Sequence, residues 1–389
     1  MPKVVHIITR LILGGAQENT LLTVEGFDRK PAWRTTLVTG PALGPEGELI
    51  ARARRNGVRL VIVDDMRRAI NPLRDLASYR ALKNILRDER PDVVHTHSSK
   101  AGILGRAAAR AVGVPRVVHT IHGMPFHAHQ NAIVNYVYIV LERMAARWTD
   151  AIVTVCDAMA DQAVAAGVAP REKFATIYSG MEVDAFLEAS KFRDQTRRRL
   201  GIPLDAPVVG KVARLFHLKG HEYFIAAMPA VLKRFPAARF LFVGDGILKD
   251  TLAAQARRLG VLDSIVFAGL VDSADVPAMV AAMDCLVHCS LREGLARVLP
   301  QALLAGVPVI SYDVDGAREV VTPGKTGWLL PPREVPGLSD AIVDCLSNPG
   351  KARAMAAAGR DLCKSRFRVE TMVDAIENLY LSLLSSKRT

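Results

Sequence analysis

Residues 285–311 read CLVHCSLREGLARVLPQALLAGVPVIS, and this stretch decides the fold class. The apolar run Cys285–His288 predicts a buried strand, and the apolar spacing of Val298–Ala305 predicts a helix. A Gly-x-Pro sequence ends the helix, and Val307–Ser311 predicts a second buried strand. A strand, a helix and a strand in this order form the repeating unit of an α/β protein with a parallel sheet.

The same alternation extends towards both ends of the chain. Before residue 190 the pattern predicts a helix from Ala16 to about Phe27. It also predicts strands at Val4–Thr9, Thr35–Thr39, Val58–Val63, Val93–Thr96, Val117–Ile121, Ala151–Val155 and Ala175–Ile177. After an Arg-rich stretch with glycine and proline breakers, strands are predicted at Val208–Ala213, Phe240–Val243 and Ile265–Phe267, and helices at Tyr223–Arg234 and Leu248–Leu259.

We therefore expect two Rossmann-like, doubly wound domains, at 1–190 and 191–368, that face each other across a cleft. The apolar spacing of Val369–Leu384 is helical, so we expect residues 369–389 to pack back on the first domain as a helix. Ligands of such sheets bind beyond the carboxyl ends of the strands, and the loops there are the places to search for chemistry.

Composition narrows the class of protein. The 389 residues are 50% hydrophobic and 23% charged, which excludes a disordered or low-complexity chain. Five scattered cysteines make no disulfide framework, so we expect a reducing compartment. The apolar start lacks a signal-peptide cleavage site, and no run reaches the ~18–20 apolar residues of a membrane span. These observations predict a cytoplasmic protein.

The chain is basic, with 51 Lys and Arg against 39 Asp and Glu and a formal net charge of +12. A basic surface favours anionic partners, such as phosphorylated small molecules or anionic lipid. The basic residues are dispersed, and the sequence has neither zinc-finger spacing nor the basic-aromatic interleaving of RNA-binding proteins. We expect no nucleic-acid partner.

In each predicted domain, the loop after the first strand carries candidate ligand-binding groups. Gly14 and Gly15 precede a helix whose N-terminal N–H groups could meet an anion, although a turn without a ligand explains the glycines equally well. Arg214 and Lys219 follow the strand Val208–Ala213 and could clamp a diphosphate from two sides. An ordinary exposed loop also carries such residues.

Glu293 lies in the loop between the strand and the helix of the opening stretch. Its carboxylate could accept hydrogen bonds from sugar hydroxyls, and the backbone N–H groups of Gly294, Leu295 and Ala296 could face a phosphate. The alternative is an acid that only caps the helix.

The histidines raise the question of a metal site. Six of the ten fall between positions 95 and 129, but their spacing matches no recognised ligand pattern, so we expect histidines at strand ends that line a polar cleft. Among them His122, before Gly123, is the best candidate to meet substrate. Asp313-Val-Asp315 follows a strand and favours a loop turn over a metal motif.

Several of these motifs, taken in their order along the chain, resemble those of the retaining nucleotide-sugar glycosyltransferases of family 4, which have the two-domain GT-B fold. The similar segments are Gly14-Gly15, His122-Gly123, Tyr178–Asp184 (with Ser179 where Asn is usual), Arg214 with Lys219-Gly220, Val243–Gly246, Phe267–Val271, Glu293 as the start of Glu-x7-Glu, and Asp315–Glu319. The resemblance covers nearly the whole chain.

The resemblance implies transfer of a sugar from a UDP- or GDP-sugar to a saccharide or lipid-linked acceptor, with retention of anomeric configuration and without a metal or other cofactor. It implies a place in cell-envelope polysaccharide or glycolipid synthesis. It assigns catalytic roles to His122, Arg214, Lys219 and Glu293. It assigns donor binding to Gly14, Gly15, Gly244, Gly246, Leu270, Val271, Gly294, Leu295, Ala296 and Gln301.

One departure concerns the second acid of Glu-x7-Glu, which binds the nucleotide ribose in the family and is Gln301 here. A glutamine oxygen still accepts from a ribose hydroxyl, but the loss of charge costs ~1 kcal/mol. Two alternatives to the transferase stay open: a non-catalytic GT-B scaffold or nucleotide-sugar binding protein weakened by Gln301, and another GT-B enzyme such as an epimerase.

The segment Asn131–Trp148 bears on the acceptor. It is apolar over much of its surface and carries Arg143 and Arg147. A helix buried in the first domain is the favoured interpretation. The alternative is an interfacial segment in peripheral contact with anionic lipid on the inner face of the membrane.

Overall fold

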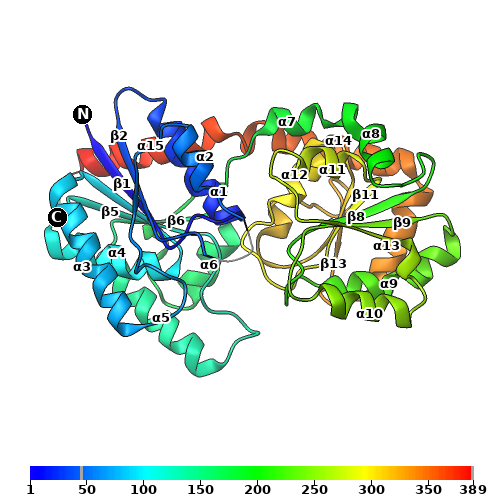
Figure 1. The fold of residues 1–389 in the computed structure, drawn as a ribbon, viewed down its shortest axis with the longest axis horizontal. Coiled ribbons are helices and arrows are strands. Elements are labelled where there is room, and N and C mark those ends of the chain that lie inside the picture. Colours follow the sequence, from blue (N-terminus) through cyan, green and yellow to red (C-terminus); the bar gives the residue numbers. More distant parts are fainter. Residues whose placement is uncertain (44–46, 387–389) are drawn as a thin grey trace. The chain divides into compact units, whose positions relative to one another are not determined.

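The computed structural model describes residues 1–43 and 47–386. It divides the chain into two compact units, each with a parallel sheet and packed helices (Figure 1). The first unit comprises Met1–Met181 and Arg368–Thr389, and the second comprises Glu182–Phe367.

The sheet of the first unit has the strand order β3-β2-β1-β4-β5-β6-β7, with all neighbours parallel. Its strands are β1 (Lys3–Ile8), β2 (Arg34–Thr39), β3 (Leu60–Ile62), β4 (Val93–His97), β5 (Arg116–Ile121), β6 (Ala151–Thr154) and β7 (Phe174–Thr176). Its helices are α1 (Gly15–Asp28), α2 (Ile50–Arg55), α3 (Pro72–Glu89), α4 (Ser99–Val112), α5 (Ala132–Ala146), α6 (Asp157–Ala165), η1 (Arg171–Lys173) and α15 (Val369–Ser385). The order reverses between β1 and β4, which is where doubly wound sheets bind ligands.

Alternate residues of β1 enter two different cores. Val4 packs in a cluster with side chains of α1 and α15, whereas Val5 packs in a cluster with side chains of α3 and α4. A strand covered on both faces is apolar throughout, which explains why the buried strands read as continuous apolar runs.

The sheet of the second unit has the order β10-β9-β8-β11-β12-β13, again parallel. Its strands are β8 (Val208–Val212), β9 (Arg239–Val243), β10 (Ile265–Gly269), β11 (Cys285–His288), β12 (Val309–Tyr312) and β13 (Trp328–Leu330). Its helices are α7 (Val183–Leu187), η2 (Ala189–Phe192), α8 (Arg193–Arg199), α9 (His221–Arg234), α10 (Lys249–Arg258), η3 (Leu262–Ser264), α11 (Val276–Ala281), α12 (Val298–Leu304), η4 (Asp315–Glu319), α13 (Val335–Ser347) and α14 (Pro349–Arg366). The predicted α/β class and the two doubly wound sheets are confirmed.

The chain passes from one unit to the other earlier than the expected boundary at 190/191. Residues 182–190 belong to the second unit, because α7 packs against α11 and α12, and η2 packs against α11. The sequence pattern does not predict β13, because glycine and proline lie on either side of its three residues.

The C-terminal helix α15 lies in the first unit, beside α1 (Figure 1). Tyr380 is fully buried and stacks on Phe27, and the amide of Asn19 donates to the Met372 sulfur at 3.1 Å. Lys30, just beyond α1, pairs with Glu377 at 2.5 Å. Apolar packing and an ion pair therefore hold this helix against α1.

Across the described residues, no helix combines the length and the apolar character needed to cross a membrane.

Candidate functional site

In the second unit, the loop after β8 carries Arg214 and Lys219 and packs against the loop after β11. The Leu291 N–H donates to the Leu218 carbonyl at 2.8 Å. Gly220 has φ +68°, and a Cβ there would lie 1.8 Å from the Cys289 carbonyl oxygen. Glycine therefore allows the two loops to touch, and this close approach places Lys219 beside Glu293.

Glu293 lies in a polar cluster at the carboxyl end of β11. The Lys219 ammonium donates to Glu293 Oε1 at 2.6 Å, with the two side chains only 24% and 18% exposed. His288 Nε2 lies 3.4 Å from the same oxygen, and the Glu293 N–H donates to Asp315 Oδ2 at 2.6 Å. The structure thus joins two of the predicted site residues, Lys219 and Glu293, directly to each other.

The charge of Glu293 is fixed by these neighbours. Burial raises the pKa of its carboxyl group, but the nearby Lys219 and His288 outweigh that effect and hold the pKa well below its ordinary value of 4.5. Burial lowers the pKa of His288, although Glu293 opposes the shift. At neutral pH the cluster therefore holds a carboxylate, an ammonium and a neutral imidazole.

The helix-capping interpretation of Glu293 is wrong. The helix α12 begins at Val298 with Arg297 at its N-cap, so Glu293 and the buried residues Gly294, Leu295 and Ala296 all precede it. Asp315 instead connects this loop to η4: it has φ +47°, and the Gly316 N–H donates to the Gly294 carbonyl at 3.1 Å. An aspartate held at positive φ is a strained position of the kind found at binding sites.

The other predicted donor-binding residues lie around the same loops. Gly244 has φ +133°, and a Cβ there would lie 2.2 Å from the Ala213 carbonyl oxygen, next to Arg214. Gly246 follows it, with its N–H donating to Asp245 Oδ1 at 2.7 Å. Leu270 is 50% exposed and Val271 is half-buried, directly after β10.

Arg214 and Gln301 complete the predicted set in this unit. Arg214 is exposed, its guanidinium lies 5.1 Å from the centre of the Phe216 ring, and its carbonyl is 2.9 Å from His221 Nε2. Gln301 is half-buried in α12.

In the first unit, one of the predicted site residues, His122, lines a pocket of about 240 Å³. Ala16, in the first turn of α1, lines it together with His122 and Gly123, which follow β5. Gly14 is the N-cap of α1 and Gly15 its first residue. Ser98 lines the pocket at φ +63°, and its hydroxyl lies 2.8 Å from that of Thr9. Ala16, which directly follows the glycine turn, therefore lines one pocket with His122 and a strained serine, Ser98.

The expectation that the histidines line a polar cleft is wrong for His95 and His97. Both are strand residues of β4 that point into the core, at 0% and 1% exposure. Only His119 and His122 of the six line the pocket of the first unit. Sequence reasoning also missed His6 and the role of Asp315, because each contacts a neighbour that is distant in sequence. It missed His288 as well, because that residue lies within the apolar strand β11, where its contact with Glu293 leaves no signal.

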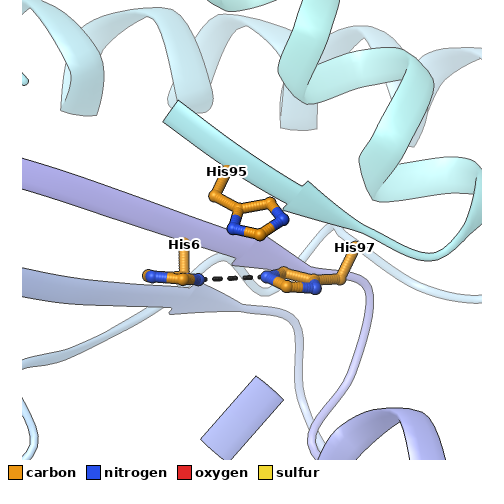
Figure 2. Close-up of side chains that lie close together, drawn as sticks. All are labelled: His6, His95 and His97. Atoms are coloured by element: carbon orange, nitrogen blue, oxygen red, sulfur yellow. Dashed lines mark hydrogen bonds between the residues drawn. The ribbon is translucent and has the colours of Figure 1, made fainter. Parts of the chain in front are cut away.

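Within the described residues, one group has its ligand atoms close enough for a metal ion, namely His6, His95 and His97, within 4.8 Å of one another (Figure 2). Both nitrogens of His95 are already within hydrogen-bond distance of Tyr380 Oη and Thr120 Oγ1, at 2.5 and 2.6 Å. Asp313 and Asp315 do not form a pair: Asp313 binds Arg318, whereas Asp315 binds the backbone of Glu293.

The helix α5 is exposed, contrary to the favoured interpretation of a buried helix. Only Glu142, Ala145 and Ala146 are buried. Its exposed apolar side chains are Ile133, Val134, Tyr136, Val137, Val140 and Met144. Ile133 and Tyr136 reach 74% and 68% exposure. The helix therefore presents an apolar surface outward.

The chain matches described families over both units. Residues 14–180 match the glycosyl transferase 4-like domain, and residues 192–362 match glycosyl transferases group 1. The chain is 28% identical over 393 residues to UDP-Gal:alpha-D-GlcNAc-diphosphoundecaprenol alpha-1,3-galactosyltransferase of Escherichia coli, with 99% of this chain and 98% of the relative covered. It is 31% identical over 271 residues to the GDP-mannose-dependent alpha-(1-6)-phosphatidylinositol monomannoside mannosyltransferase of Mycobacterium tuberculosis, with 68% and 69% covered.

Solved structures share the fold over almost the whole chain. HepE from Anabaena, in complex with UDP-glucose, aligns with a TM-score of 0.84 at 22% identity, covering 98% of this chain and all of that one. Sucrose-phosphate synthase from Thermosynechococcus elongatus aligns with a TM-score of 0.86 at 20% identity, covering both chains fully. Taken with the family matches and the mannosyltransferase relative, the two parallel sheets show that the chain belongs to the family 4-like glycosyltransferases of the GT-B fold.

Proposed function

We propose that the protein transfers a sugar from a nucleoside diphosphate sugar to a lipid-linked or saccharide acceptor of the cell envelope, with retention of anomeric configuration. The observation that carries the proposal is the Lys219–Glu293 pair, held at 2.6 Å between the two strand-end loops of the second unit. The relatives support the choice of substrates, since one is named for a UDP-sugar and a diphosphoundecaprenol acceptor and another for GDP-mannose.

In this reaction, negative charge develops on the diphosphate as the bond to the sugar breaks. Arg214 and Lys219 extend from one strand-end loop and would stabilise that charge, which is electrostatic catalysis by preorganised cations. Their presence supports a reaction that needs no metal. A chelator such as EDTA should therefore leave turnover unchanged, and a lost activity that Mg²⁺ restores would contradict this part of the proposal.

Glu293 is suited to orient the donor sugar. Its carboxylate stays ionised through Lys219 and His288, so it can accept hydrogen bonds from sugar hydroxyls without becoming protonated itself. Retention then requires that the acceptor attacks from the face that the diphosphate leaves. The anomeric configuration of the isolated product, read by NMR, tests this: an inverted product would contradict the proposed mechanism.

The first experiment is a calorimetric titration of the purified protein with UDP, GDP and ADP in turn. We expect one nucleotide to bind clearly more tightly than the other two, which identifies the base of the donor. A turnover screen with sugars of that nucleotide follows, in which nucleoside diphosphate should appear in proportion to glycosylated product. No binding of any nucleotide at millimolar concentration would contradict the proposed function.

The acceptor side of the proposal rests on α5. Its exposed apolar side chains, together with the exposed Arg147 at its C-cap, have the character of a helix that lies on an anionic lipid surface. The net charge of +12 favours the same partner. We therefore infer that α5 docks on anionic lipid and brings the enzyme to a lipid-linked acceptor.

Vesicle flotation tests this docking. The protein should float with phosphatidylglycerol vesicles and stay behind with phosphatidylcholine vesicles, and salt should weaken the binding. Ile133→Ser should reduce flotation, while Ile247→Ser, which alters a similarly exposed residue of the second unit (68% against 74%), should not. Equal flotation of both variants, or binding that is insensitive to salt, would contradict docking through α5.

A further inference from the structure

Three buried or half-buried histidines form a hydrogen-bonded chain that ends at the pocket of the first unit. His6 Nδ1 and His97 Nε2 are 3.0 Å apart, and this bond is drawn in Figure 2. His97 Nδ1 and His122 Nε2 are 3.1 Å apart. His97 thus uses both ring nitrogens, one towards His6 in the core and one towards His122, which lines the pocket.

The two inner rings are neutral. Burial lowers the pKa of His6 to about 3. Burial, reinforced by the neighbouring histidines, holds the pKa of His97 well below its ordinary value. A neutral imidazole carries one N–H and one lone pair, so His97 donates one of its two bonds and accepts the other.

This restriction couples the protons of the whole chain. If His6 carries its proton on Nδ1, it donates to His97 Nε2, so His97 carries its proton on Nδ1 and donates to His122 Nε2. If His6 carries its proton on Nε2, both bonds run the other way and His122 donates from Nε2. In the first arrangement all three rings carry a proton on Nδ1, and in the second all three carry one on Nε2.

The free end of the chain decides between the two arrangements. His6 Nε2 is buried and has no hydrogen-bond partner. In the Nε2–H arrangement it would be a buried N–H without an acceptor, whereas in the Nδ1–H arrangement it is only an unused lone pair. Buried N–H groups without a partner are the rarer case in folded proteins. The Nδ1–H arrangement is therefore favoured.

We propose that His97, backed by His6, is a positioning residue that holds neutral His122 in the Nδ1–H tautomer. Which nitrogen of a histidine carries the proton is set by the bond that the other nitrogen makes. His122 therefore presents a donor at Nδ1. That this matters for turnover rests on the proposed function and on the catalytic role that the family resemblance implies for His122, but the tautomer itself does not.

The alternative for this cluster is a metal ion, and the ring geometry opposes it. A ring nitrogen directs its lone pair in the plane of the ring. The His6 and His97 rings lie edge to edge with an interplanar angle of 15° and centroids 5.3 Å apart, whereas His95 stacks on His97 at 29° with centroids 4.4 Å apart (Figure 2). A common metal ion would need one lone pair from each ring to point at the same place, but the facing nitrogens of His6 and His97 already point at each other, 3.0 Å apart, and the His95 ring lies over His97 in a nearly parallel plane.

The test is NMR of the full-length protein with ¹⁵N-labelled histidine rings, with signals assigned through single substitutions. Wild-type His6, His97 and His122 should all show the Nδ1–H tautomer. His97→Phe, which keeps a ring but offers no hydrogen bond, should remove this constraint, so that His122 no longer shows the Nδ1–H tautomer alone. His97→Gln is a milder variant with the same expected effect, since its amide can reach His6 but not His122.

His119→Phe is the matched control. His119 is also buried but pairs in register with Thr96, on the opposite face of the sheet from His97, and its Nδ1 lies 2.9 Å from Thr96 Oγ1. His122 should keep its tautomer in this variant. A wild-type His122 in the Nε2–H form, or tautomers that differ among the three rings, would overturn the proposal. Once a transferase assay exists, His97→Phe should lower kcat about tenfold, which corresponds to the loss of one hydrogen bond. Nucleotide binding should be unchanged. The NMR result stands even if no transferase activity is found.

Discussion

Lys219→Met removes the cation that faces Glu293 and should destabilise the second unit. At 2.6 Å and an effective dielectric of about 20, the gross attraction of the pair is on the order of 6 kcal/mol, most of which offsets the desolvation of the two charges. Since each side chain is at most 24% exposed, losing one partner leaves a largely buried carboxylate unpaired, which costs about 2 kcal/mol. For a unit of this size, that corresponds to a fall in Tm of about 4–8 °C.

Scanning calorimetry of four proteins measures the effect: wild type, Lys219→Met, Glu293→Gln and the double variant. The double variant should be more stable than Lys219→Met alone, because it leaves no unpaired charge. Lys351→Met is the control, since Lys351 and Asp344 form a pair of similar length, 2.7 Å, with side chains that are 50% and 34% exposed. An ion pair that is so exposed to solvent should contribute at most about 1 kcal/mol to the free energy of unfolding.

The pH dependence gives the same experiment a second readout. The folded-state pKa of Glu293 is depressed, so the pair stabilises the fold at pH values above the ordinary 4.5 and this contribution is lost as the pH falls towards the folded-state pKa. The gap in Tm between wild type and Lys219→Met should therefore be constant near neutral pH and narrow below about pH 4.5. Two results would refute the reasoning. One is that the losses in unfolding free energy of Lys219→Met and Glu293→Gln sum to that of the double variant within about 0.5 kcal/mol. The other is that the gap in Tm between wild type and Lys219→Met does not change with pH.

Three further substitutions test the second unit. Arg214→Ala should lower turnover at least about tenfold, because a cation facing the leaving diphosphate is lost; unchanged kinetics would remove Arg214 from the site. Gln301→Glu should tighten binding of the preferred nucleoside diphosphate by about 1 kcal/mol in calorimetry, since a charged acceptor replaces a neutral one, and weaker binding would contradict a ribose contact. Gly244→Ala should lower the Tm by at least about 3 °C and weaken nucleotide binding, because φ +133° and the Ala213 carbonyl oxygen oppose a Cβ; an unaffected Tm would show that the turn can relax.

The fold class follows from local patterns. Apolar runs such as Cys285–His288 and the helical spacing after them are properties of short segments, and a strand buried on both faces must be apolar throughout. The sequence therefore predicts both parallel sheets, and its strand positions differ from the observed ones mainly at the ends. The three-residue strand β13 is missed, because the glycine and proline on either side of it are typical of a turn.

Only part of the candidate site can be predicted from local sequence. Loops after strands are the expected place for ligand-binding groups, which is why Lys219 and Glu293 can be named from sequence. Their pairing depends on β8 and β11 being neighbours in the sheet, and on a glycine at 220 that lets the two loops touch. No pattern in the sequence contains that adjacency.

The sequence by itself determined the α/β class, the two doubly wound sheets and the loops that carry the site, because these depend on periodicity within segments of a few residues. Tertiary structure alone decided that α5 is exposed and that Glu293 pairs with Lys219 rather than capping a helix. It also decided that His6 Nδ1 lies 3.0 Å from His97 Nε2, although the two residues are 91 positions apart in sequence. Burial, charge pairing and tautomer depend on which side chains meet in space, and parallel strands bring together residues whose separation in sequence carries no signal.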